Sequence, residues 1–503
     1  MTRSWLSASL ALAILLGAFA PPAAPAQEEA PPPTPIFPGA PPVPVQLPAP
    51  AATDRPLPIN LPTALRLGQA RALDIALAAE RSRLAVAQLQ RANVLWLPTV
   101  QFGIDYARHD GRIQRTEGEV FDTSRSSFMA GVGPSAVFAV SDAIFAPLAA
   151  RQVLRARSAE LQAASNDTLL AVAEAYFNAQ QARGELAGAL DAVRRAEELV
   201  RRAQELAPGL APPVEAVRAR TELARRRQAV ESARERWRVA SADLMRILRL
   251  DPAALVEPLE PPQLRITLIG PDCPVDDLIA VALTNRPELA AQQALVRAAL
   301  QRLKQERLRP LVPSVLLRGT ATNPAGTLST GTFGGGRNAF VGDFGARNDI
   351  DLQVLWQFES LGLGNKARVE ERRAEHRLAV LEAFRIQDRV AADVAQAHAQ
   401  LQSAAARVVE AEGGLRDAVD SVEKNFEGLM QTRRAGNVNL LVIRPQEVVA
   451  AIQALAQSYN DYYGATADYN RAQFRLYRAL GQPAQLLLPD GAACLPPNAA
   501  AGP

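Results

Sequence analysis

Hydrophobic and polar residues alternate strictly along residues 348–359, NDIDLQVLWQFE. Successive side chains of a strand point to opposite faces, so this pattern predicts a strand with one apolar face and one polar face. The apolar positions are Ile350, Leu352, Val354, Trp356 and Phe358. The polar positions are Asp349, Asp351, Gln353 and Gln357.

The same alternation predicts three more strands. In the first, Phe102, Ile104 and Tyr106 alternate with polar or small residues that include Asp105. In the second, one face is made by Phe128, Ala130, Val132, Ala136 and Phe138. A weaker strand begins at Val315, and residues 322–348, rich in Gly, Ser, Thr and Asn, are typical of a surface loop. We therefore expect four strands per chain, arranged as two hairpins with long loops.

Long helices are predicted after each hairpin. No proline occurs at residues 149–206 or 367–442, and the second helix could reach ~100 Å. Its apolar residues recur in steps of seven, which imposes a left-handed supercoil on neighbouring helices. They are Val380, Val394, Leu401, Val408, Leu415, Val422 and Leu429. A helix that returns after the first long helix carries the same repeat at Leu223, Val230, Trp237 and Leu244.

The chain repeats one plan twice, at an offset of about 215 residues. Each copy begins with a helix of ~25 residues, which the apolar periodicity predicts. The segment Leu97-Pro98-Thr99-Val100 that follows in the first copy corresponds to Val312-Pro313-Ser314-Val315 in the second. We assign residues 61–272 and 273–483 to the two copies and residues 484–503 to a C-terminal tail.

The N-terminus has the pattern of a secretory signal peptide. Arg3 precedes an apolar run from Leu6 to Phe19, and Ala24-Pro25-Ala26 is a small-residue cleavage site. The apolar run is shorter than the ~20 residues that a spanning helix needs. We therefore expect residues 1–26 to be removed on export, and the proline-crowded residues 27–60 to form a linker.

Composition argues against several classes of function. The net charge of +3 comes from 55 basic and 52 acidic residues, whereas a nucleic-acid-binding protein would be dominated by basic residues. His109, His376 and His398 are isolated, so we predict no enzyme, no metal site and no cofactor. Cys273 and Cys494 either form a disulfide in an oxidising compartment or remain two buried thiols.

A short turn separates each long helix from the helix that returns. Gly209 and Gly436 lie where the two helical hairpins must reverse, a usual place for glycine just past a helix end. Pro212 and Pro213 suit the first turn of the returning helix.

The two-faced strands restrict the architecture further. A chain without a spanning helix can cross a membrane only as a closed barrel, because open strand edges are not stable in lipid. Strands of ~9–11 residues with one apolar face have the required length. Four strands are too few to close a barrel, so several subunits would have to share one.

From about Leu61 to about Pro483 the sequence resembles the TolC family of outer-membrane channel-tunnels. The resemblance is carried by the Leu-Pro-Thr-Val segment and its repeat, by Ala175-Tyr176-Phe177, by residues 361–368 (LGLGNKAR), and by the two turns. It implies a homotrimer in which each chain gives four strands to one twelve-stranded barrel and its helices to a tunnel through the periplasm. The resulting fold class is mainly α, with a long coiled-coil helical barrel and a small β part.

The resemblance also implies partners and site residues. The two turns would form a periplasmic tip that docks on an adaptor protein bound to an inner-membrane pump, and outer-membrane lipid would surround the barrel. The tip residues would be Gly209, Leu210, Pro212, Gly436, Asn437, Val438 and Leu440. Asp105, Asp349, Asp351, Gln353 and Gln357 would line the barrel, and their apolar neighbours from Phe102 to Tyr106 and from Ile350 to Phe358 would face lipid.

One position departs from the family. Members often carry an acidic residue six positions after the second tip glycine, where this chain has Val442. Arg433 and Arg434 precede the turn instead, and with Asn439 and Val442 they are candidates for the entrance constriction. Our hypothesis is an entrance that is closed by apolar contact or by a ring of arginines and has no cation preference. The alternative is that these arginines face the adaptor or solvent.

We therefore expect an outer-membrane export duct of a tripartite efflux or type I secretion system in a Gram-negative-type envelope. The alternative function is a periplasmic coiled-coil adaptor or scaffold without a pore.

Overall fold

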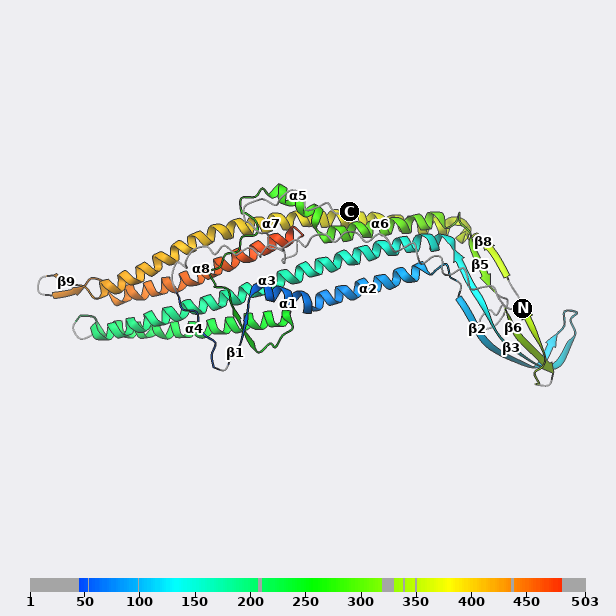
Figure 1. Cartoon of the computed structure of the whole chain (residues 1–503), viewed down its shortest axis with the longest axis horizontal. Helices are drawn as coiled ribbons and strands as arrows, with labels where there is room; N and C mark the ends of the chain where they lie inside the picture. Colours follow the sequence, from blue (N-terminus) through cyan, green and yellow to red (C-terminus); the bar gives the residue numbers. More distant parts are fainter. Residues whose placement is uncertain are drawn as a thin grey trace, which may run out of the picture. The chain divides into compact units, whose positions relative to one another are not determined.

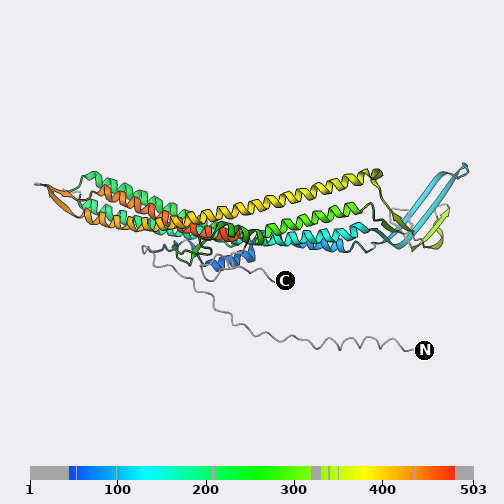
Figure 2. The same cartoon turned by 90° about the horizontal axis from the view of Figure 1, so that it is seen from above.

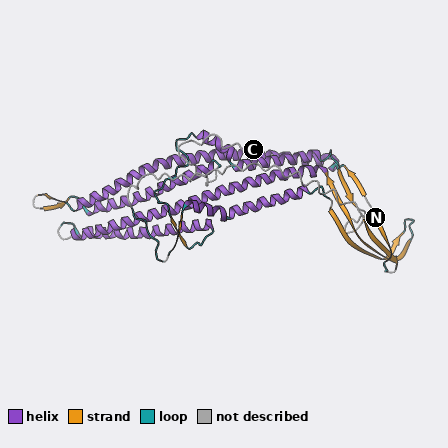
Figure 3. Ribbon diagram, viewed as in Figure 1, coloured by secondary structure: helices purple, strands orange, loops and turns teal. Residues whose placement is uncertain are grey.

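The computed structural model describes residues 45–481, except residues 53, 98, 207–209, 319–329, 338–339, 349–350 and 436–437. All described residues belong to one structural unit, Pro38–Pro503. Long helices make up most of it, and a sheet lies at one end (Figures 1 and 3). Eight α-helices occur in the described part: α1 Leu61–Arg71, α2 Leu73–Asn93, α3 Val140–Leu206, α4 Pro213–Leu248, α5 Val275–Asn285, α6 Pro287–Leu308, α7 Leu363–Leu429 and α8 Pro445–Ala479.

The same order of elements occurs twice along the chain. Helices α1 to α4 correspond to α5 to α8, and the two long helices, α3 and α7, have 67 residues each. At 1.5 Å per residue, each long helix spans ~100 Å. The helix of ~25 residues predicted before the strands of each copy is present as α2, with 21 residues, and α6, with 22. A break at the extended residues Ala72 and Arg286 separates each of them from a shorter helix of 11 residues that was not predicted. Pro287 accounts for the second break, since a proline disfavours helical geometry in the residue before it.

The set of four adjacent helices differs between the two halves of the unit. On the sheet side, α2, α3, α6 and α7 are successive neighbours. Towards the other end, α4 takes the place of α2 beside α3, and α8 takes the place of α6 between α3 and α7 (Figure 1). Only α3 and α7 run through both halves, which is also visible in the view from above (Figure 2).

Seven-residue repeats form the core, as predicted. Val394, Leu401 and Val408 of α7 are at most 2% exposed, and the repeat continues as a buried stripe to Leu429. Val380 is only half-buried. On α4, Val230, Trp237 and Leu244 are buried. The predicted coiled-coil packing is confirmed for these positions.

Helices α3 and α8 approach closely through glycines that face tyrosines. A Cβ atom added to Gly188 would lie 2.6 Å from Cβ of Tyr459, and one added to Gly184 would lie 2.6 Å from the ring of Tyr463. The Tyr459 hydroxyl donates a hydrogen bond to Asp191 of α3 at 3.1 Å. The two helix hairpins are therefore held together by a contact that any larger side chain would obstruct.

The sheet has six strands among the described residues. They lie in four lines, because β5 and β6 follow one another end to end, and so do β7 and β8. The strands are β2 Thr99–Gln114, β3 Val120–Ala139, β5 Ser314–Arg318, β6 Thr330–Arg337, β7 Gly342–Asn348 and β8 Asp351–Leu355. Strand β3 pairs with β2 along one side and with β5 and β6, end to end, along the other. Strand β8 pairs with β5 and strand β7 pairs with β6, each on the side away from β3. All these pairs are antiparallel, so the four predicted strands correspond to β2, β3, β5–β6 and β7–β8.

Two strand predictions need correction. Residues 330–337 and 342–348, predicted as loop, form β6 and β7. The strand predicted over 348–359 ends at Leu355, where its partner β5 begins with Ser314 after Pro313. Ser360 and Leu361 then take left-handed conformations, with φ of 49° and 59°, and turn the chain into α7.

Part of the predicted linker is ordered. Residues Arg55–Ile59 form β1, which pairs in parallel with β4, Ala254–Pro258. Just before β1, Pro48 is buried beside Trp237 and Leu255, and Asp54 forms a salt bridge with Arg238 at 3.1 Å. The segment therefore crosses α3 and α4 as a packed strap, a feature that its proline content did not predict.

Candidate channel wall and tip

The strand register brings the predicted apolar residues to one face of the sheet. Residues directly opposite each other in a pair point to the same face. Ile104 is opposite Ala130, Phe102 is opposite Val132, and Val315 lies between Phe138 and Val354. These residues come from all four lines of the sheet, yet they share one face.

This apolar face is open. Phe102 is 84% exposed, Ile104 68% and Leu352 64%. Tyr106 and Val354 are also exposed. Exposed apolar side chains gathered on one face of a sheet indicate a contact with lipid or another protein.

The opposite face is the more polar one along β2 and β8. Asp105 and Gln353 lie on it, and both are half-buried. Asp351 also belongs to it by register, although its side chain is outside the description. Asp349 and Ile350 lie outside the described residues.

Three predicted wall residues are not on a strand. Trp356, Gln357 and Phe358 follow the end of β8, and all three are exposed. Their position beside the start of α7 places them where the sheet joins the helices. Their predicted assignment to alternating faces of a strand therefore does not hold.

Both sides of this layer have unpaired edges among the described residues. Strand β2 pairs only with β3, and β7 and β8 pair only with β6 and β5. The outer helices next to them carry exposed apolar side chains: Leu73, Leu77 and Leu84 on α2, and Leu378, Leu381 and Phe384 on α7. The two edges differ from one another, so a head-to-tail contact would join the β2 edge of one copy to the β7–β8 edge of the next.

The first turn at the far end lies between α3 and α4. Leu210 is 39% exposed, and Pro212 is exposed beside it. Gly209 lies outside the described residues.

The second turn is a β-hairpin, where a simple reversal was predicted. Strands β9, Thr432–Ala435, and β10, Val438–Leu441, pair with Arg433 opposite Leu440 and Arg434 opposite Asn439. Arg433, Arg434 and Val442 are exposed. Gly436 and Asn437 lie outside the described residues, as do the side chains of residues 438–440. The two-residue loop Gly-Asn is a recognised signal for such a hairpin.

Polar side chains join the two helix hairpins near this end. Gln453 of α8 donates to Glu222 of α4 at 2.8 Å, and Glu222 is only 2% exposed. One turn closer to the tip, Arg218 of α4 contacts Gln446 of α8 at 3.3 Å. The two glutamines, Gln446 and Gln453, are seven residues apart on α8, a polar repeat that the search for apolar repeats missed.

Asp191 forms a further polar junction between α3 and α8. Burial tends to raise the pKa of its carboxyl group, but hydrogen bonds from Arg195, Arg194 and Tyr459 outweigh it and hold that pKa below the usual range. The carboxylate therefore stays charged while it ties the two helices together.

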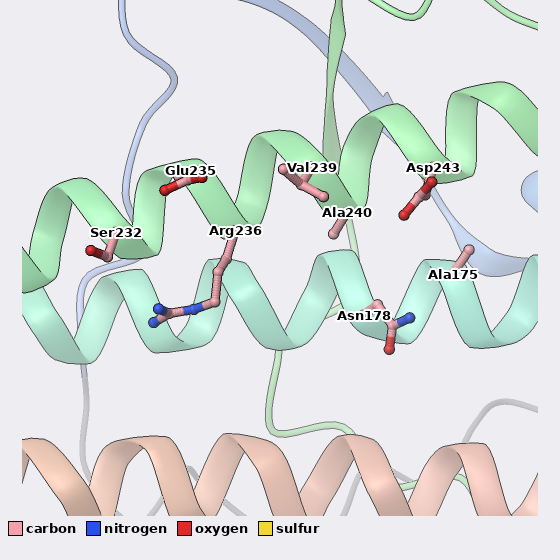
Figure 4. Close-up of a pocket in the computed structure, with 8 residues that line it drawn as sticks. All are labelled: Ala175, Asn178, Ser232, Glu235, Arg236, Val239, Ala240 and Asp243. Atoms are coloured by element: carbon pink, nitrogen blue, oxygen red, sulfur yellow. The ribbon is translucent and has the colours of Figure 1, made fainter.

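One shallow pocket lies between α3 and α4, lined by Asn178, Arg236 and Asp243 among others (Figure 4). Arg236 already pairs with Glu185 at 3.0 Å. No cluster of three His, Cys, Asp or Glu residues suited to a metal occurs among the described residues. Cys273 is buried and Cys494 lies outside the description, so their pairing stays a prediction.

Among the described residues, every helix is too short or too polar to traverse a bilayer.

Part of the chain matches one family model, and the fold resembles several solved structures. Residues 65–248 match the model of the outer membrane efflux protein family. The search of curated protein sequences found no match. Together with the fold, the match confirms the resemblance to the TolC family that the sequence predicts.

Solved structures extend the likeness to most of the chain. The outer-membrane channel OprN is 16% identical with a TM-score of 0.66, covering 84% of this chain and 90% of that one. VceC from Vibrio cholerae is 16% identical with a TM-score of 0.64, covering 84% and 96%. CmeC from Campylobacter jejuni is 15% identical with a TM-score of 0.64, covering 84% and 85%. The chain has the fold of these channel proteins.

Proposed function

We propose that the chain forms an outer-membrane export duct of an efflux or secretion system, with its helices extending through the periplasm. The observation that carries the proposal is the strand register, which gathers apolar residues from four lines of one sheet on one face. The family match over residues 65–248 and the channel folds of OprN, VceC and CmeC support it. The duct is passive, so energy would come from a partner pump.

The proposed assembly is a homotrimer. The sheet of one copy has two open edges, and exposed leucines continue these edges onto α2 and α7. Joining the α2 edge of one copy to the α7 edge of the next would pair the strands and bury both sets of leucines. Three such contacts would give a closed barrel of twelve strand lines, and closure removes every open edge from lipid.

Docking of a periplasmic adaptor is proposed at the opposite end. Leu210 and Pro212 of the first turn and the β9–β10 hairpin of the second turn are the parts that an adaptor would meet. The bond between buried Glu222 and exposed Gln453 lies close behind them. A shift of α7 and α8 against α3 and α4 during opening would have to break this bond.

Membrane extraction tests the proposal against the alternative of a periplasmic adaptor or scaffold. Full-length protein should stay with outer membranes through high-salt and alkaline washes and should require detergent for release. After purification it should run as a trimer and form pores in planar bilayers. Release by salt alone as a water-soluble monomer would support the scaffold instead.

The entrance hypothesis has its own test. If Arg433 and Arg434 line the constriction, single-channel recordings in a salt gradient should show no cation preference. Arg433→Ala should then shift the reversal potential towards that of a cation-selective pore. Strong cation selectivity that is the same in the wild type and in this variant would refute the hypothesis.

A further inference from the structure

A row of basic side chains crosses the sheet near the β2–β3 turn. His109 of β2 is directly opposite Arg125 of β3, and Arg125 is directly opposite Arg337 of β6. Directly opposite residues have Cβ atoms roughly 4.5–5.5 Å apart and point to the same face. All three side chains are exposed. His109 and Arg337 are separated by more than 200 residues in sequence, so only the strand pairing brings them together.

The register assigns this row to the polar face. Side chains alternate along β3, so Arg125 and Met129 share a face, and Met129 is opposite Asp105. The row therefore lies on the same face as Asp105, displaced towards the end of the sheet that is farther from the helices (Figure 1). The apolar residues Phe102 and Ile104 lie on the other face.

Within the described residues, no carboxylate forms an ion pair with the two arginines of the row. Other arginines of the β2–β3 hairpin each have one: Arg108 with Asp110 at 2.6 Å, Arg112 with Asp122 at 3.4 Å, and Arg115 with Glu119 at 2.9 Å. Arg125 and Arg337 form no salt bridge within the part of the chain that the structure describes. Like charges placed directly opposite each other are destabilising unless a counter-charge offsets them.

An aromatic ring holds one side of the row. The guanidinium carbon of Arg125 lies 5.8 Å from the ring centroid of Phe121, and that of Arg115 lies 4.5 Å from the same ring. Stacking on an aromatic face restrains a guanidinium group without removing its charge. The planar donors of Arg125 remain able to bind an anion.

We propose that His109, Arg125 and Arg337 form an anion-binding row on the inner wall of the duct, near its outer end. The row would attract small anions and the carboxylate or phosphate groups of anionic cargo, since guanidinium groups bind both in a bidentate manner. It rests on the proposed function, because the polar face becomes an inner wall only in a closed barrel. Three copies would bring six arginines into one ring.

The expected size of the effect follows from Coulomb's law with screening. Six unit charges, each ~10 Å from the axis in ~0.1 M salt, enrich chloride about four-fold and deplete potassium by a similar factor at that point. The row is one section of a long conduit, so the measured permeability ratio should change less than the local concentrations. A several-fold loss of chloride preference is expected when both arginines are replaced.

Reversal potentials in a potassium chloride gradient test the proposal. Full-length wild type is compared with Arg125→Gln/Arg337→Gln and with the charge-conserving Arg125→Lys/Arg337→Lys. Arg112→Gln is the matched control, because Arg112 is an exposed arginine of the same hairpin that lies on the other face and pairs with Asp122. The comparison is repeated in an Arg433→Gln/Arg434→Gln background, so that ion selectivity at the tip does not mask ion selectivity at the outer end.

The double Gln variant should lose chloride preference several-fold, while the Lys variant and Arg112→Gln should keep the wild-type ratio. If the wild type forms pores and the double Gln variant has the same chloride-to-potassium permeability ratio, the proposed anion-binding row is refuted and the proposed duct is not. An equal loss in Arg112→Gln would also overturn it, since any surface charge would then have the same effect. Failure of the wild type to form pores would overturn the duct and the row together.

Discussion

Replacing Gly188 by Ala should separate α3 from α8. The new Cβ would lie 2.6 Å from both Cβ and Cγ of Tyr459, and a Cβ atom cannot move away without its backbone. Overpacking of a closely packed site costs ~1–3 kcal/mol, and the rigid neighbour favours the upper end. The gain from replacing a helical glycine by alanine, ~1 kcal/mol, offsets part of it. Gly188→Ala should therefore destabilise the protein by about 2 kcal/mol.

Gly413→Ala is the matched control. Gly413 also lies within a long helix, but nothing in the chain comes within 4 Å of the position that its Cβ would take. This variant keeps the propensity gain without a clash, so it should be stabilised by ~1 kcal/mol. Chemical denaturation of the purified proteins, followed by far-ultraviolet circular dichroism, measures both. A Gly188→Ala protein as stable as Gly413→Ala would refute the close approach of α3 and α8.

Three further predictions concern single groups. The pKa of Asp191 is lowered in the folded protein, so its carboxylate stabilises the fold fully above the ordinary carboxyl pKa of ~4, and this stabilisation is lost as pH falls through the lower folded value. Asp191→Asn should therefore lower the melting temperature at pH 7 and flatten its decline in acid. A melting temperature that is the same in the variant and the wild type at every pH would contradict this. Trp237→Phe removes the 2.9 Å bond from Nε1 to the carbonyl of Val256, which lies in the buried β4 strand, and should cost ~1–3 kcal/mol in the same denaturation assay; a change below the error of measurement would show that the bond contributes nothing. If Cys273 and Cys494 form a disulfide, denatured protein treated with a thiol-alkylating reagent should gain the mass of two alkyl groups only after the disulfide has been reduced. A gain of two alkyl groups without reduction would exclude the bond.

Local patterns account for what the sequence predicted well. The seven-residue repeat from Val394 to Leu429 depends on residues of one helix, and every one of these positions is buried. Alternation at Phe102, Ile104 and Tyr106 likewise predicts one face of β2 without knowledge of its partners.

Features that depend on distant partners were missed. Strand β6 has the sequence TGTFGGGR, and glycine disfavours strands. It forms because β3 is longer than β5, so a stretch of the same edge of β3 is left for β6 to pair with. The row that contains Arg125 and Arg337 could not be found without this register, since no local pattern connects the two residues.

Other features left local signals that apolar periodicity overlooked. Pro287 marks the break before α6, and Gly436-Asn437 marks the β9–β10 hairpin. Glu222 and Gln453 repeat the positions of Glu215 and Gln446 one heptad along. A search for polar as well as apolar heptads would have located the contact between α4 and α8.

Spin labels on neighbouring wall positions test the central claim most directly. Single cysteines would replace Ile104 and Leu352 on the apolar face, and Asp105 and Gln353 on the polar face, in full-length protein reconstituted in lipid. The labels at 104 and 352 should be relaxed by oxygen dissolved in the bilayer, and those at 105 and 353 by a water-soluble nickel complex. Equal relaxation of all four labels by the nickel complex would mean that both faces meet water, and the sheet would not be the wall of a membrane duct.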